Sequence, residues 1–238
     1  MDDWKFQPAK DHGLSPLQRW RSERREGGLV STLSQFSARI AVRSYLTVYH
    51  RVSFIGRENL PAAGPFVLSA NHASHLDSVL LAQMVPWSIR RNLFPVAAGD
   101  VFFETPIIAA FAATVINALP MWRHKVGRHA LDDLRNRLVN DRCSYILFPE
   151  GRRSPDGTLL PFKSGIGMLI GGTPIPVVPC HIRGAYESLP RDGKFPRPTK
   201  ISVRIGPPIT FAHHPNTREG WNAIASELEH AVRDLAGS

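Results

Sequence analysis

Residues 71–77, with the sequence NHASHLD, hold a histidine and an aspartate that could act together in catalysis. His72 and Asp77 are five positions apart, and on a regular helix this spacing separates two side chains by about 140°. They can meet only if His72 lies in a loop and Asp77 lies in the first turn of a following helix. An aspartate that holds an imidazole fixes its tautomer and leaves a general base. The alternative is that Asn71, Ser74 or Asp77 only caps a helix.

The flanking residues predict the elements that position this stretch. An apolar run at 66–68 precedes it and an apolar helical pattern at 79–84 follows it, which indicates strand, loop and helix. A second apolar run, 143–148, leads directly into the sequence PEGRRS. Functional residues of α/β sheets gather at the carboxyl ends of strands. We therefore expect His72 and Glu150 to lie at neighbouring strand ends.

Together the two stretches resemble the glycerolipid acyltransferase family, the 1-acylglycerol-3-phosphate acyltransferase group. The first signature of that family is Asn-His, four residues and then Asp, and Asn71, His72 and Asp77 match it. The later signature is Phe-Pro-Glu-Gly, usually followed by Thr-Arg-Ser. This chain has FPEGRRS at 148–154, with Arg152 in the place of the threonine. The resemblance extends to residues 162–165 and 175–179 and covers roughly residues 50–210.

The resemblance implies transfer of a fatty acyl group from an acyl thioester, acyl-CoA or acyl carrier protein, to the free hydroxyl of a lysophospholipid. It implies 1-acylglycerol-3-phosphate as acceptor, with another lyso-lipid as the alternative. His72 would be the base and Asp77 would orient it, and no cofactor is expected because the thioester is already activated. The residues expected to bind substrate are Asn71, Arg123, Glu150, Gly151, Arg152, Arg153 and Lys163.

Other functions are weighed against this one. A metal site could use His72, His75 and Asp77 as ligands, but it leaves the second motif without a role. The basic composition alone would suit a nucleic-acid-binding module, yet the arginines are scattered and no aromatic-basic recognition motif accompanies them. We therefore expect no metal and no nucleic-acid partner. A non-catalytic lipid-binding protein would not need the intact His72 and Asp77.

The composition is that of a globular protein with anionic partners. The 238 residues are 43% hydrophobic and 21% charged, enough for one domain with a substantial core. The formal net charge is +9 and the pI is about 10.1, which favours anionic lipid or phosphorylated ligands. Cys143 and Cys180 fall in apolar runs and are expected to be buried free thiols in a reducing compartment.

No run of 18 clean apolar residues occurs, so no spanning helix is expected. Because the family that the chain resembles works on lipid, the resemblance implies peripheral contact with the membrane, at its cytoplasmic face. A short arginine-rich helix is predicted from Ser15, and a second helix is predicted over residues 29–49. The second helix either packs on the core or lies on an anionic membrane surface with cationic flanks. Its apolar positions are Leu29, Leu33, Phe36, Ile40 and Leu46, with Arg39, Arg43 and Arg51 among the others.

These patterns predict a single α/β domain with a mixed central sheet flanked by helices and an N-terminal helical membrane-surface segment. Residues 1–49 would form the tail and amphipathic helices, and residues 50–238 the acyltransferase domain. A strand is expected at 114–119, and the resemblance to the family implies that Arg123, which follows it, contacts the acceptor phosphate. The apolar pair Phe102 and Phe103 would line either the core or an acyl-chain slot. Further strands are expected at 52–56, 92–97, 175–182 and 201–205, and helices at 127–140, near 163, and around 221–232.

Overall fold

A mixed sheet forms the centre of the molecule. The computed structural model describes residues 15, 29–90, 92–98, 119–121, 128–190, 192–193 and 195–237. Within these residues the sheet has eight strands in the order β1-β7-β6-β2-β5-β3-β4, with β8 paired to β6. The strands are β1 (Ser53–Ile55), β2 (Val67–Ala70), β3 (Leu93–Ala98), β4 (Leu119–Met121), β5 (Ser144–Leu147), β6 (Pro176–Arg183), β7 (Ser202–Ile205) and β8 (Ile209–Thr210). The predicted fold class, a mixed α/β sheet flanked by helices, is confirmed.

The three central strands run in parallel and bring their carboxyl ends to one edge. Ser69 of β2 pairs with Leu147 of β5, and Ala70 of β2 pairs with Cys180 of β6. The β3 strand is also parallel to β5, whereas β7 and β8 pair with β6 in the antiparallel sense. The loops that leave β2, β5 and β6 therefore emerge side by side.

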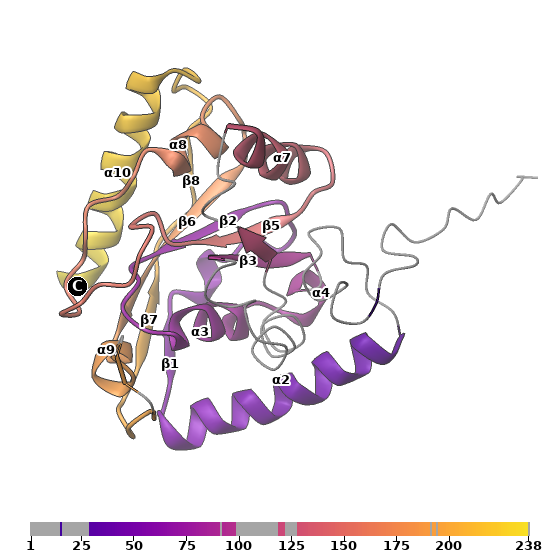
Figure 1. Ribbon diagram of the computed structural model, residues 1–238, viewed down its shortest axis with the longest axis vertical. Helices are drawn as coiled ribbons and strands as arrows, with labels where there is room; N and C mark the ends of the chain where they lie inside the picture. The colour runs from indigo at the N-terminus through magenta and orange to yellow at the C-terminus, as the bar shows by residue number, and fades with distance from the viewer. Residues whose placement is uncertain are drawn as a thin grey trace, which may run out of the picture.

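Each face of the sheet is covered by its own helices (Figure 1). One core packs α3 (Leu76–Met84) against strand residues such as Leu68 and Val178. The other packs α7 (Arg128–Val139), α8 (Gly165–Ile170) and α10 (Arg218–Gly237) against residues such as Tyr145 and Val177. The remaining elements are short: η1 (Arg57–Asn59), α4 (Trp87–Arg90) and α9 (Ala185–Ser188). Strands with continuous burial, such as β2, are typical of parallel sheets covered on both faces.

Gly167 explains how closely α8 approaches α10. A Cβ atom at this position would lie 2.4 Å from the Cα atom of Trp221. The close approach of the two helices therefore requires glycine at position 167, whereas a Cβ atom at Gly165 would meet nothing within 4 Å.

The α2 helix (Leu29–Tyr49) packs on the domain through a different face from the one its sequence suggests. Leu46 is buried as expected, but Arg39 is also buried, whereas Phe36 and Ile40 are exposed. Arg39 is held by a hydrogen bond from Nη2 to the Val85 carbonyl oxygen, at 3.0 Å. Arg39, which lies outside the apolar positions of the sequence pattern, is buried because its guanidinium caps a neighbouring helix and its stem packs inward.

Some predictions fall on residues outside the described part of the chain. These are the arginine-rich helix that follows Ser15, the pair Phe102 and Phe103, and Arg123. The strand expected at 114–119 is described only as β4, Leu119–Met121. The division of the chain at residue 50 stays a prediction. In the part of the chain that the structure describes, no helix combines the length and the apolar character needed to cross a membrane.

Candidate active site

His72 and Asp77 form an oriented pair at the carboxyl end of β2. His72 lies in the loop after the strand, Asp77 lies in the first turn of α3, and His72 Nδ1 is 2.9 Å from Asp77 Oδ2. The same oxygen accepts the backbone N–H groups of Ala73, at 2.7 Å, and Ser74, at 2.8 Å. An ionised carboxylate only accepts, so His72 Nδ1 carries the hydrogen and Nε2 is left as the basic atom.

The segment that follows β5 fixes the position of His72. The ring of Phe148 stacks on the imidazole, with centroids 4.1 Å apart and planes 15° from parallel. The backbone N–H of His72 donates to Glu150 Oε1 at 2.8 Å, and the backbone N–H of Ser154 donates to the His72 carbonyl oxygen at 2.7 Å. The two motifs of the sequence thus form one unit, in which the second motif fixes the base supplied by the first.

Glu150 is almost fully buried and both of its carboxylate oxygens bind backbone amides. Oε1 accepts from His72, and Oε2 accepts from Leu160 at 3.2 Å. Burial raises the pKa of Glu150 to about 7, and the two backbone hydrogen bonds oppose that rise. The geometry therefore gives Glu150 a positioning role between two loops. Direct contact of Glu150 with a substrate stays a prediction.

Asn71 joins β2 to β6 just behind the histidine. Its Nδ2 donates to the Ile182 carbonyl oxygen at 2.9 Å, and its Oδ1 accepts from the Ile182 N–H at 2.8 Å. The side chain is buried, and this pairing extends the ladder between the two strands beyond the last paired residue. Its expected contact with substrate stays a prediction too.

Basic side chains surround the turn at Gly151. Gly151 has φ +72°, a left-handed conformation that favours glycine, and a Cβ there would lie 2.9 Å from Lys163 Nζ. Lys163 and Arg152 are exposed and Arg153 is half-buried. The structure therefore brings Gly151, Lys163 and the two arginines to the edge that holds His72. Arg123 cannot be placed with them because it lies outside the described residues.

His75 is close to the pair but differs from His72 in its environment. Burial, the Arg153 guanidinium and the His72 ring lower the pKa of His75 to about 4. The imidazole is therefore neutral at ordinary pH. Within the described residues, three side chains of His, Cys, Asp or Glu do have donor atoms within 4.8 Å of one another, but they are His213, His214 and Glu227. His72, His75 and Asp77 do not form the cluster that the metal alternative requires.

Three arginines support the helix that carries Asp77, and sequence reasoning missed this role. Arg39 bonds the Val85 carbonyl oxygen, Arg57 bonds that of Met84 at 2.8 Å, and Arg90 bonds that of Ala82. Cations at the last carbonyls of a helix satisfy its unpaired acceptors and stabilise its dipole. No local pattern predicts this role, because the three arginines come from three separate elements, α2, η1 and α4, that meet only in the folded protein.

The site therefore combines an oriented histidine–aspartate pair at the carboxyl edge of a mixed α/β sheet with basic groups beside it, an arrangement that can act as a general base. The sequence matches the Acyltransferase family over residues 51–183, which is more than half of the chain. The protein belongs to this family.

Curated relatives carry a narrower name. The chain is 24% identical over 186 residues to 1-acyl-sn-glycerol-3-phosphate acyltransferase alpha of Mus musculus, covering 76% of this chain and 62% of the relative. It is 30% identical over 158 residues to the chloroplastic 1-acyl-sn-glycerol-3-phosphate acyltransferase BAT2 of Brassica napus, covering 65% and 44%. The chain thus spans less than two thirds of the length of either relative.

A solved structure shares the fold. It is described as the 1-acyl-sn-glycerophosphate (LPA) acyltransferase PlsC from Thermotoga maritima. The TM-score is 0.67 and the sequences are 25% identical, with 87% of this chain and 79% of that chain covered.

Proposed function

We propose that the protein transfers a fatty acyl group from an acyl thioester to the free hydroxyl of a lysophospholipid, with 1-acylglycerol-3-phosphate as the acceptor. The observation that carries the proposal is the His72–Asp77 pair, held at 2.9 Å at the carboxyl edge of β2 and fixed by the second motif. The names of the Mus musculus and Brassica napus relatives and of PlsC support the choice of acceptor.

The reaction needs little beyond an oriented base. His72 Nε2 takes the proton of the acceptor hydroxyl as its oxygen attacks the thioester carbonyl carbon, and Asp77 stabilises the imidazolium that forms. The new C–O bond is completed when the C–S bond breaks, and the imidazolium returns the proton to the leaving thiolate. The donor is acyl-CoA or acyl carrier protein, and no further cofactor takes part. The buried carboxylate of Glu150 keeps the base at the position from which this proton transfer occurs.

The basic groups at this edge fit a phosphorylated acceptor. Arg153, Arg152 and Lys163 lie around the Gly151 turn, and Arg123 is proposed to join them. Arginine pairs with phosphate oxygens through two parallel hydrogen bonds, which aligns the acceptor as well as attracting it. Under this proposal the phosphate lies at the Gly151 turn and the hydroxyl lies at His72.

A panel of donors and acceptors tests the proposal. The purified protein is offered acyl-CoA or acyl carrier protein with lysophosphatidic acid, lysophosphatidylcholine or monoacylglycerol, and products are identified by mass spectrometry. We expect phosphatidic acid as the main product, formed by wild type and not by His72→Ala. Preference for another lysophospholipid would retain acyl transfer but overturn the acceptor. Absence of any acylated product with both donors would overturn the function.

We further propose that α2 attaches the protein peripherally to an anionic membrane. The large apolar side chains exposed along the described part of α2 and the loop beside its end include Phe36 at 46%, Ile40 at 54%, Val48 at 80% and Phe195 at 83%. Tyr49 links this loop to α2, since its hydroxyl donates to the Pro196 carbonyl oxygen at 3.0 Å. The exposed Arg43 and Arg51 lie on the same element or directly after it. Apolar anchors with cationic flanks are typical of interfacial helices.

Vesicle flotation tests the attachment. We expect wild type to float with vesicles rich in anionic lipid, and binding to weaken above about 0.1 M salt, where charges are screened beyond about 10 Å. Val48→Glu should reduce binding strongly. Val139→Glu is the matched control, because Val139 is also exposed but lies on α7, on the other side of the sheet (Figure 1). Equal binding by both variants would assign attachment to another surface.

A further inference from the structure

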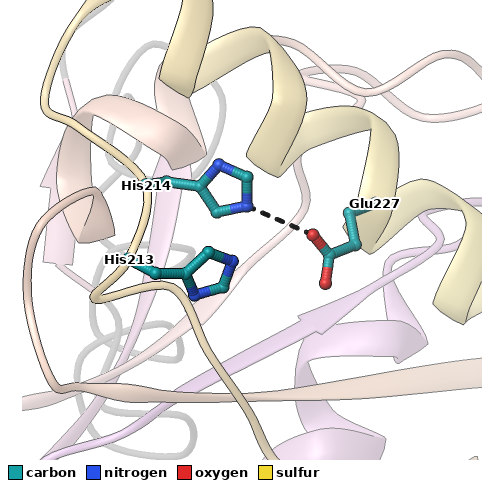
Figure 2. A group of neighbouring side chains, drawn as sticks. All are labelled: His213, His214 and Glu227. Carbon is teal, nitrogen blue, oxygen red and sulfur yellow. Dashed lines mark hydrogen bonds and ion pairs between the residues drawn. The ribbon is translucent and has the colours of Figure 1, made fainter.

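A cluster of two histidines and a glutamate lies apart from the catalytic edge (Figure 2). His213 and His214 follow β8, and Glu227 projects toward them from α10. One donor atom from each side chain lies within 4.8 Å of the other two. Nothing in the proposed acyl transfer uses these residues, so the cluster needs a separate explanation.

The distance between His214 and Glu227 suits a shared metal ion. His214 Nε2 lies 3.3 Å from Glu227 Oε2. Two ligands of a tetrahedral zinc ion, each about 2.0–2.1 Å from the metal, are about 3.3–3.4 Å apart. A direct charge-assisted N–H···O hydrogen bond is shorter, about 2.7–2.9 Å. The separation is that of a long hydrogen bond or ion pair, and it also matches the edge of a coordination tetrahedron.

The chain holds the two histidines side by side before any ion binds. Their ring centroids are 4.2 Å apart with planes tilted by 41°, and the ring of buried Phe211 lies 5.9 Å from that of His214. A hydrogen bond from Trp221 Nε1 to Asn216 Oδ1, at 2.6 Å, ties the same segment to α10. The ring contacts therefore hold the two imidazoles close together, and the proximity of their donor atoms to Glu227 is already present in the folded chain.

The exposure of the cluster lets an ion enter from solvent. The His214 side chain is 18% exposed and that of Glu227 is 47% exposed, and His213 is exposed as well. A site with three protein ligands and access to water can complete its tetrahedron with a water molecule. Two imidazoles and one carboxylate favour zinc and its neighbours among the transition metals over magnesium or calcium, which prefer all-oxygen sites.

We propose that His213, His214 and Glu227 bind one Zn²⁺ ion that fastens the β8–α10 connection to α10. The ion would be structural, because the cluster lies near the amino end of β6, whereas His72 lies at the carboxyl ends of the central strands. Thr210 of β8 pairs with Pro176, the first residue of β6, whereas His72 follows Ala70, which pairs with Cys180 farther along β6. The fastened helix also supports the segment before Lys163, because Glu229 accepts the Phe162 N–H at 3.0 Å.

Calorimetric titration with ZnCl₂ tests the proposal on the full, untagged chain after chelator treatment and dialysis. We expect about one equivalent of Zn²⁺ to bind wild type. In His214→Ala and in Glu227→Gln the affinity should fall by at least the about 10–100-fold that loss of an outer-shell partner costs, because each variant lacks a ligand. His230→Ala is the matched control, since His230 is exposed on the same helix and its Nδ1 lies 2.7 Å from the Ser226 carbonyl oxygen. This control should bind as wild type does, and MgCl₂ should give no binding heat.

A second readout separates this site from the other histidines of the chain. Zn²⁺ should raise the Tm of wild type and of His230→Ala by a few degrees and leave that of His214→Ala unchanged, because binding stabilises only the folded protein that holds the site. All variants should keep wild-type circular dichroism and acyl transfer. The proposal is overturned if wild type binds no stoichiometric Zn²⁺. It is equally overturned if His214→Ala and Glu227→Gln bind the ion as tightly as His230→Ala does.

Discussion

The backbone N–H of His72 donates to Glu150 Oε1 at 2.8 Å, across 78 positions of sequence. This contact joins the loop after β2 to the loop after β5, and Glu150 Oε2 continues the link to the Leu160 N–H. The proposed base is therefore fixed by a residue of the second motif rather than by its own loop alone. Positioning of this kind matters because a shift of about 1 Å in a catalytic group can cost about 10²-fold in rate.

Replacing Glu150 by glutamine should weaken this link without removing the side chain. The amide oxygen can accept only one of the two backbone hydrogen bonds, and the amide NH₂ group then faces the other N–H. We expect kcat to fall about tenfold or more while the acceptor KM changes little. Steady-state kinetics with the acceptor varied checks this. A large rise in acceptor KM at unchanged kcat would instead assign Glu150 to acceptor binding.

The pH dependence of stability gives a second readout for Glu150. Its pKa in the folded protein is about 7, above the ordinary value of 4.5, so the folded state binds this proton more tightly. The resulting stabilisation is fully present below about pH 4.5 and is lost as the pH rises through about 7. The Glu150→Gln variant should therefore lose less stability than wild type over this interval. Urea unfolding at pH 5, 6 and 7 measures the difference, and parallel profiles would argue against the raised pKa.

Asn71 should contribute to stability through its two bonds with the Ile182 backbone. Asn71→Ala leaves a buried N–H and a buried carbonyl unpaired, which costs about 1–3 kcal/mol and lowers the Tm by several degrees. Asn71→Asp should be no better, because it can accept from Ile182 but cannot donate. Asn136→Ala, at an exposed position on α7, is the control and should unfold as wild type does. Differential scanning calorimetry that showed Asn71→Ala to be neutral would return Asn71 to a substrate-binding role.

Arg153 should govern preference for a phosphorylated acceptor. Loss of a charge-assisted contact costs about 1.5–3 kcal/mol, or about one to two decades in kcat/KM. Arg153→Ala should raise the KM for lysophosphatidic acid far more than the donor KM, and Arg153→Lys should rescue only in part because lysine lacks the planar fork. Arg218→Ala, at an exposed position on α10, serves as the control. Unchanged preference for lysophosphatidic acid over monoacylglycerol in Arg153→Ala would remove Arg153 from the phosphate site.

Local patterns predicted much of the fold, because strands and helices here have clear apolar periodicity. Strands β1, β2, β3, β5, β6 and β7 and helices α3, α7 and α10 lie within a few residues of their predicted ranges. The meeting of His72 and Asp77 was also predictable, because the five-residue spacing requires a loop before a helix. Short elements without periodicity, such as α4, α9 and β8, were not foreseen.

What the sequence did not reveal depends on contacts between distant residues. Charge alone does not predict the burial of Arg39, whose guanidinium donates to the Val85 carbonyl oxygen at the end of α3, a residue 46 positions away in the sequence. Likewise, the position of Glu150 in a motif suggested contact with substrate, and only the three-dimensional structure shows both of its oxygens bound to backbone amides. Phe148 stacks on His72 for the same reason, since β2 and β5 are neighbours in space.

The identity of the base is tested most directly by comparing acyl transfer in His72→Ala and His75→Ala, two histidines three positions apart in one loop and helix start. Product formation from acyl thioester and lysophosphatidic acid is followed by mass spectrometry, with folding verified by circular dichroism. We expect His72→Ala to lose about 10²–10⁴-fold or more in kcat, Asp77→Asn to lose nearly as much, and His75→Ala to stay close to wild type. Near-normal turnover by His72→Ala would contradict the proposed mechanism, and an equal loss in His75→Ala would favour a site in which both histidines act.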